Sequence, residues 1–201
     1  MWALVESDSI TKIINNPKAM VIGDVQYPAK IFQLWSGSEL NAIGIYEVVT
    51  NSTNFKDEKW YINTNESYAF ADDQVTRSWG TATPKAHADT LWTAQDETDG
   101  KGTEGEVATR GLKYNLIKDL KSQVANELAR TDWYITRNTE KETAIPSAIS
   151  THRDAVRTKQ AEMETAITNA SDTPALETLY TYTTTDGVQS RPLGELPTLE
   201  S

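Results

Sequence analysis

Cysteine is absent from this 201-residue sequence, which excludes disulfides and cysteine-based zinc sites. Histidine is scarce: the two histidines, His87 and His152, fall in different predicted domains, so a catalytic triad or a histidine-rich metal site is hard to build. No run approaches the ~20 apolar residues of a membrane span, and the first residues turn polar too soon for a signal peptide. We therefore expect no metal site, no membrane insertion and assembly in a cytoplasm.

Positive charge is also in short supply. Lysine and arginine together number 19 against 29 aspartates and glutamates, which gives a net charge of −10. A protein that binds the nucleic-acid backbone needs clustered lysines and arginines, so we expect no nucleic-acid partner. The apolar fraction of 38% is low for a compact enzyme, and no Walker sequence or G-x-S-x-G motif occurs. The glycines at 100, 102 and 105 match the G-x-G-x-x-G motif of nucleotide-binding loops, but no strand precedes them. The sequence predicts a non-enzymatic protein with no catalytic residue and no cofactor.

Short strand-like segments separated by turn residues fill residues 1–95, which we predict to be a β-rich domain. The strands are expected at 2–6, 10–14, 19–22, 25–27, 45–49, 60–62, 67–70 and 74–80. A short helix at 39–43 is expected between them, with Ser36 or Ser38 as its cap and Gly44 as its stop.

An acidic, glycine-rich segment at 96–106 is interpreted as a linker, because it has no apolar residue that would anchor it to a core. The offset of Gly100 and Glu106 matches a calcium-binding loop, but Gln95 occupies the first ligand position, where aspartate is needed. The solvated linker is therefore the preferred interpretation.

Residues 107–181 carry the long helical periodicity of the chain. Apolar residues at spacings of three and four predict one helix from Leu112 to about Thr131, and a second helix begins at Pro146 and runs to about Ala170. The two helices form a predicted helical hairpin, and residues 182–201 form a predicted extended arm. The fold class is therefore α+β: a small antiparallel β-rich domain, an acidic linker, the helical hairpin and the arm.

Trp133 and Tyr134 lie at the joint between the two helices. The preferred interpretation is that they plug the open end of the hairpin, and the alternative is an exposed aromatic anchor for a partner. Apolar rows along both helices leave surface that one partner helix cannot cover, which predicts a homo-oligomer or a larger assembly. The candidate protein-interaction residues are Leu116, Leu120, Val124, Leu128, Trp133, Tyr134, Arg153, Val156 and Arg157.

Two segments carry a family resemblance. Residues 128–157 contain L-x-x-T-D-W-x-x-x-R at 128–137, then Pro146, Arg153 and Arg157. This pattern resembles a segment of the tail assembly chaperone family of tailed bacteriophages, which also occurs in phage tail-fibre and virion accessory proteins. His152 stands where the pattern has an aromatic residue. Residues 28–46 look like the N-terminal module of many phage tail-associated proteins.

The resemblance implies a virion structural or accessory protein of the phage tail, in the fibre, baseplate or adaptor region. Its expected partners are other phage tail proteins, and its expected location is the tail region of a virion assembled in the bacterial cytoplasm. Two alternatives stay open: a tail or tail-fibre assembly chaperone that is absent from the mature virion, and a carbohydrate-binding module that uses exposed tryptophan and tyrosine.

Overall fold

The computed structural model describes residues 1–199 and divides the chain into two compact units, with the boundary between Thr83 and Pro84. The large sheet lies in the first unit and the long helices lie in the second, which confirms the α+β class. The predicted boundary after Gln95 therefore differs from the observed one, because residues 84–95 belong to the helical unit.

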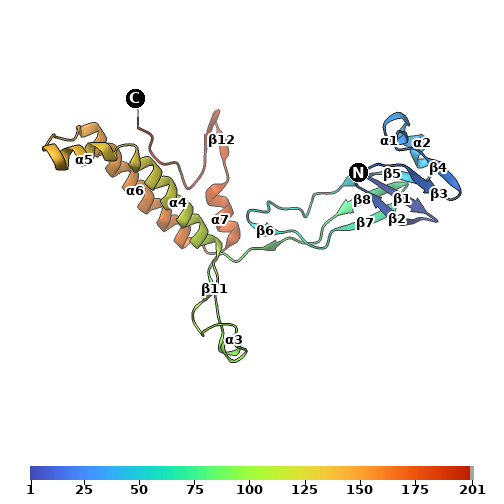
Figure 1. Cartoon of the computed structure of the whole chain (residues 1–201), viewed down its shortest axis with the longest axis horizontal. Helices are drawn as coiled ribbons and strands as arrows, with labels where there is room; N and C mark the ends of the chain where they lie inside the picture. The colour runs from blue at the N-terminus through green and yellow to red at the C-terminus, as the bar shows by residue number, and fades with distance from the viewer. Residues whose placement is uncertain (200–201) are drawn as a thin grey trace. The chain divides into compact units, whose positions relative to one another are not determined.

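A five-stranded sheet forms the N-terminal unit, in the order β2-β1-β5-β8-β7 (Figure 1). Its strands are β1 (Trp2–Glu6), β2 (Ser9–Ile14), β5 (Ile45–Thr50), β7 (Ser67–Ala71) and β8 (Gln74–Ser78). Neighbouring strands are antiparallel except β5 and β8, which are parallel. The edge strands β2 and β7 also contact each other, so the sheet curls toward a closed barrel.

Alternation along the strands gives the sheet two apolar faces. Ala3, Val5 and Val75 form the core on one face. On the other face, Leu4 and Ile45 belong to a second core with residues of two short helices. These helices are α1 (Ile31–Leu34) and α2 (Gly37–Asn41), and a hairpin of β3 (Met20–Ile22) and β4 (Val25–Tyr27) packs beside them.

The cap predicted for the short helix α2 is confirmed. The backbone N–H of Glu39 donates to Ser36 Oγ at 3.3 Å, and the Glu39 carboxylate accepts from the Ser36 N–H at 2.7 Å. The Glu39 carboxylate also accepts from the Ser36 hydroxyl at 2.7 Å, and the hydrogen bonds it accepts from Ser36, the backbone one first, hold the pKa of Glu39 below its usual value. Gly44 follows with a φ of +81°, and a Cβ there would lie 2.5 Å from the carbonyl oxygen of Val5. Glycine is therefore required where the chain turns from α2 into β5.

The rest of the N-terminal unit is an irregular ribbon held by aromatic side chains. It contains β6 (Tyr61–Ile62), and β9 (Thr83–Pro84) straddles the unit boundary. Trp60 and Tyr61 are each 3% exposed. The rings of Phe55 and Trp79 lie 4.8 Å apart. Aromatic contact thus stabilises a segment that has little regular backbone hydrogen bonding.

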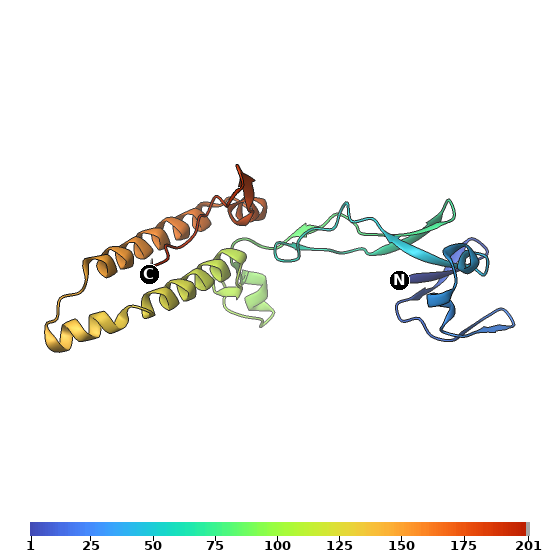
Figure 2. The same cartoon turned by 90° about the horizontal axis from the view of Figure 1, so that it is seen from above.

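The main helices of the C-terminal unit are α4 (Leu112–Ala129), α5 (Asp132–Lys141), α6 (Ser147–Asn169) and α7 (Thr173–Tyr180). Helices α4 and α6 lie side by side and antiparallel (Figure 2), as predicted for residues 112–131 and 146–170. The predicted two-helix hairpin is nevertheless incomplete, because a separate helix, α5, occupies its connection. Buried apolar side chains fill the contact between the long helices: Leu116, Leu120, Val124, Ile149, Val156, Met163 and Ile167.

The predicted linker is instead a folded excursion. It consists of β10 (Thr90–Leu91), α3 (Ala94–Thr98) and β11 (Val107–Thr109). Trp92 exchanges backbone hydrogen bonds with Gly105 and Glu106, and its indole packs so closely on Gly102 that a Cβ there would collide with it. The prediction failed because it treated the acidic residues as solvated, whereas Asp96 accepts from the backbone N–H of Thr93 in the capping box of α3 and pairs with Lys101 at 3.0 Å.

Both ends of this excursion meet at Asp89. Its carboxylate accepts from the Gly111 N–H at 2.8 Å and from the Arg110 guanidinium at 2.6 Å. These contacts hold the pKa of Asp89 below its usual value, with the Gly111 hydrogen bond as the largest cause. The N–H groups of Leu112 and Lys113 donate to the carbonyls of residues 86 and 87, so residues 86–89 complete the start of α4.

The expected extended arm is partly wrong as well. A small hairpin of β12 (Thr183–Thr185) and β13 (Val188–Ser190) follows α7, and the segment after it returns along the long helices (Figures 1 and 2). Leu193 is 3% exposed, and its N–H donates to the Leu179 carbonyl at 3.0 Å. The arm therefore packs on its own chain through Leu193. Residues 200–201 of the predicted arm lie outside the described residues.

Candidate interaction site on α5

A buried arginine joins three helices at the far end of the helical unit. Arg153 of α6 is 7% exposed. Its Nη1 donates to the Leu128 carbonyl at 2.7 Å, to Thr131 Oγ1 at 2.7 Å and to Asp132 Oδ1 at 2.9 Å. We call this group of residues the arginine clamp. It ties the end of α4 and the start of α5 to α6.

The clamp explains the bend between α4 and α5. Helix α4 ends with unpaired carbonyls and the negative end of its dipole, which favours a cation such as Arg153. Helix α5 begins at Asp132, where a carboxylate is favoured for the opposite reason. Thr131 lies between the helices with non-helical backbone angles and is 1% exposed. The direction of α5 is therefore fixed by hydrogen bonds rather than by apolar packing.

A second polar contact supports the same junction. His152 Nε2 lies 3.1 Å from Glu127 Oε1, and Arg130 pairs with Glu127 at 3.0 Å. The Arg130 hydrogen bond, followed by the contact with His152, holds the pKa of Glu127 below its usual value. His152 is 8% exposed, so this position holds a buried polar pair where the family pattern has an aromatic residue.

Helix α5 itself buries none of its ten residues. Trp133 is 60% exposed and Ile135 is 37% exposed. The Arg137 guanidinium lies over the Trp133 ring at 4.6 Å and near the Tyr134 ring at 5.7 Å, and the two rings are 4.9 Å apart in an edge-to-face arrangement. We call Trp133, Tyr134, Ile135 and Arg137 the α5 patch.

The structure separates the predicted interaction residues into three groups. Buried core positions are occupied by Leu116, Leu120, Val124 and Val156, with Leu128 half-buried beside them, so their surface is already covered within the chain. Arg153 is the centre of the clamp, and Arg157 is exposed and pairs with Asp154. The prediction that Trp133 plugs the hairpin is wrong, because α5 points this side chain into solvent.

Two members of the α5 patch were missed from the sequence, namely Ile135 and Arg137. The spacing of Trp133 and Arg137 contained a usable signal, since residues four apart share one face of a helix. That signal requires a helix at 132–141, which the absence of an apolar stripe concealed.

No group of three or more histidines, aspartates and glutamates that could hold a metal ion occurs within residues 1–199. Over the same residues, no helix has the length and apolarity needed to cross a bilayer.

Comparisons with known proteins add no relative. No protein-family model, curated protein or solved structure matches this chain. The α5 patch and the sequence resemblance are therefore the features of this chain that bear on its function.

Proposed function

We propose that this protein is a non-enzymatic component of a bacteriophage tail, in its fibre, baseplate or adaptor region, and that it contacts another tail protein through the α5 patch. The resemblance of residues 128–157 to phage tail-associated proteins supports the first part. The observation that carries the second part is the composition of α5, a ten-residue helix with no buried residue. Helices shorter than about 12 residues are marginal in water without packing.

The α5 patch also indicates the chemistry of its partner. Trp133 offers a large rigid apolar surface of the type that dominates interface energies. Arg137 has no hydrogen bond or ion pair within residues 1–199, and its buried Nε lacks an acceptor. A partner segment that brings an apolar side chain next to a carboxylate would cover the tryptophan and pair with the guanidinium. The proposed partner is therefore an acidic, apolar segment of another tail protein.

Mass spectrometry of purified phage particles tests the proposal. Particles from a phage that encodes this chain should contain it in stoichiometric amounts. The Trp133→Ala variant should be absent from particles. Its free energy of unfolding should change by less than about 1 kcal/mol, because the side chain is mostly exposed. Tyr114→Ala is the matched control, since Tyr114 is an exposed aromatic residue of α4 that also stacks with an arginine, at 4.2 Å.

The same experiment separates the alternative roles. A chain that is absent from particles but co-purifies with unfinished tail subunits in infected cells would be an assembly chaperone, and the structural role would be refuted. Equal incorporation of wild type and Trp133→Ala would refute the assignment of the contact to the α5 patch. Light scattering on the isolated protein then shows whether the partner is a second copy or a different chain.

A further inference from the structure

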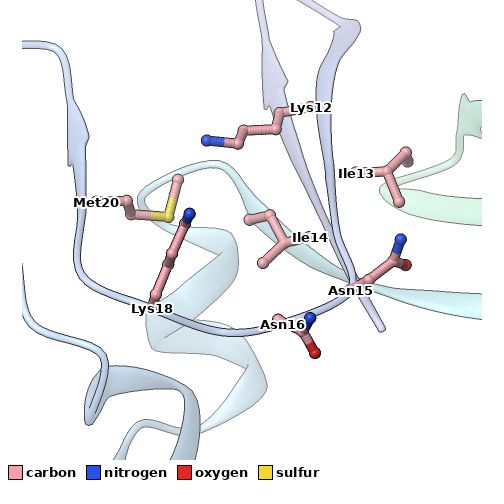
Figure 3. A pocket seen from close by; sticks show the side chains of 7 residues that line it. All are labelled: Lys12, Ile13, Ile14, Asn15, Asn16, Lys18 and Met20. Carbon is pink, nitrogen blue, oxygen red and sulfur yellow. The ribbon is translucent and has the colours of Figure 1, made fainter.

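A small pocket in the N-terminal unit lies between the end of β2 and the segment that leads to β3. Its volume is about 250 Å³. Seven residues line it, and none of them is acidic (Figure 3). This absence is notable in a chain with a net charge of −10. The pocket and α5 belong to different units of the chain, and the proposed function does not use the pocket.

Two lysines give the pocket its charge. Figure 3 shows the side chains of Lys12, from β2, and Lys18, from the following segment, pointing into the same space. Neither ammonium group has a hydrogen bond or an ion pair with any residue between 1 and 199. Two unpaired ammonium groups that converge on one space favour an anion between them.

The remaining lining residues describe the body of the ligand. Ile14 and Met20 form the apolar side of the pocket, and both belong to the core that supports β2. Asn15 and Asn16 lie where the chain leaves β2, and Figure 3 shows the Asn15 amide on the opposite side of the strand from the two lysines, which leaves Asn16 at the edge of this space. The Asn16 amide can both donate and accept hydrogen bonds. An anion with an apolar face and several hydroxyl groups matches all three features.

We propose that this pocket binds the carboxylate-bearing sugar of an acidic polysaccharide. The sugar carboxylate lies between Lys12 and Lys18, the C–H face of its ring packs on Ile14 and Met20, and one of its hydroxyl groups faces Asn16. The small volume suits a single sugar residue, since larger ligands occupy pockets of about 300–1,000 Å³. An aspartate or glutamate side chain of a protein partner has no ring face and would leave the apolar side uncovered.

Amide chemical shifts of the ¹⁵N-labelled full-length protein, titrated with sodium glucuronate, test this site. The amides of residues 12–20 should shift and saturate with a dissociation constant of about 1 mM, the value that typical ligand efficiency gives for a group of this size. Lys12→Met and Lys18→Met should each weaken binding about tenfold, because each removes one charge-assisted hydrogen bond. Lys30→Met is the matched control, since Lys30 is exposed in the same unit and outside the pocket.

Three reference ligands decide between the chemistries. Glucose tests the need for the carboxylate, acetate tests the need for the sugar ring, and N-acetylglutamate amide imitates an acidic protein segment. If all three ligands saturate the amide shifts of residues 12–20 only weakly or not at all, the proposal is supported. Equal binding of acetate and glucuronate would reduce the pocket to a general anion site, and tighter binding of the glutamate derivative would assign it to a protein partner. Either result overturns the proposal, as does an unsaturated glucuronate titration. Trp133→Ala should bind glucuronate normally, so failure here leaves the α5 patch untouched.

Discussion

Replacing Arg153 by methionine measures how strongly the arginine clamp holds the junction of α4, α5 and α6. Methionine keeps an unbranched, flexible stem and removes the guanidinium. The three acceptors all face Nη1, at 2.7, 2.7 and 2.9 Å. Because Nη1 carries two hydrogens, these contacts amount to about two good charge-assisted hydrogen bonds, worth about 3–6 kcal/mol.

The Nε of the Arg153 guanidinium offsets part of this stabilisation. This Nε is buried without an acceptor, and burial of such a donor costs about 1–2 kcal/mol that the methionine variant regains. The expected loss of unfolding free energy is therefore about 2–4 kcal/mol. For a unit of this size, at about 4 °C per kcal/mol, the loss corresponds to a fall in Tm of about 8–16 °C.

Thermal unfolding of the full-length protein, followed by circular dichroism at the helical signal, provides the measurement. Arg157→Met is the matched control, because Arg157 lies one turn further along α6, is 54% exposed and makes one surface pair with Asp154 at 3.4 Å. The control should change the stability by less than about 0.5 kcal/mol. If Arg153→Met also costs less than about 1 kcal/mol, the clamp does not determine the stability of the junction, and the explanation of the bend is wrong.

Three further predictions concern other parts of the chain. Gly44→Ala should destabilise the N-terminal unit by more than about 1 kcal/mol in urea unfolding, because of the positive φ and the collision with Val5; an unchanged midpoint would contradict this. A fragment of residues 1–83 should unfold cooperatively when heated, since its cores are complete within that range, and a fragment without a transition would contradict the boundary. The pKa of Glu127 is lower in the folded protein than its ordinary value of 4.5, so the ionised carboxylate stabilises the fold at pH values above 4.5. This stabilisation is lost as the pH falls through the lowered pKa. Glu127→Gln should therefore show a smaller loss of stability than wild type between pH 7 and pH 3.

The long elements were predictable because their signals are local. The heptad of Ile149, Val156 and Met163 identifies α6, and the cap at Ser36 identifies α2. Helix α5 was missed because residues 132–141 lack an apolar stripe, and their conformation depends on Arg153 from another helix. A contact of this kind leaves no periodic trace in the sequence.

The wrong predictions for residues 90–109 and for Trp133 have the same cause, since the contacts that decide these structures leave no periodic signal in the sequence. The excursion at 90–109 is held by a backbone ladder and by Trp92, and neither is visible in a composition dominated by acids and glycines. For Trp133, residue type alone does not determine which way the side chain faces. The tryptophan was predicted to be buried because buried aromatic residues are common, and only the helical geometry of α5 places it outside.

Because the two ends of residues 90–109 meet at Asp89, the sequence between them can vary without moving the start of α4. Residues 90–109 leave and rejoin the helical unit at one carboxylate, so the path into α4 does not depend on what lies between. Lengthening a surface segment whose ends are already fixed adds little entropic cost. Sequence divergence and insertions can therefore accumulate in the excursion while α4 keeps its place, and a peptide or fluorescent label inserted near Gly100 would report on the protein without disturbing the α5 patch.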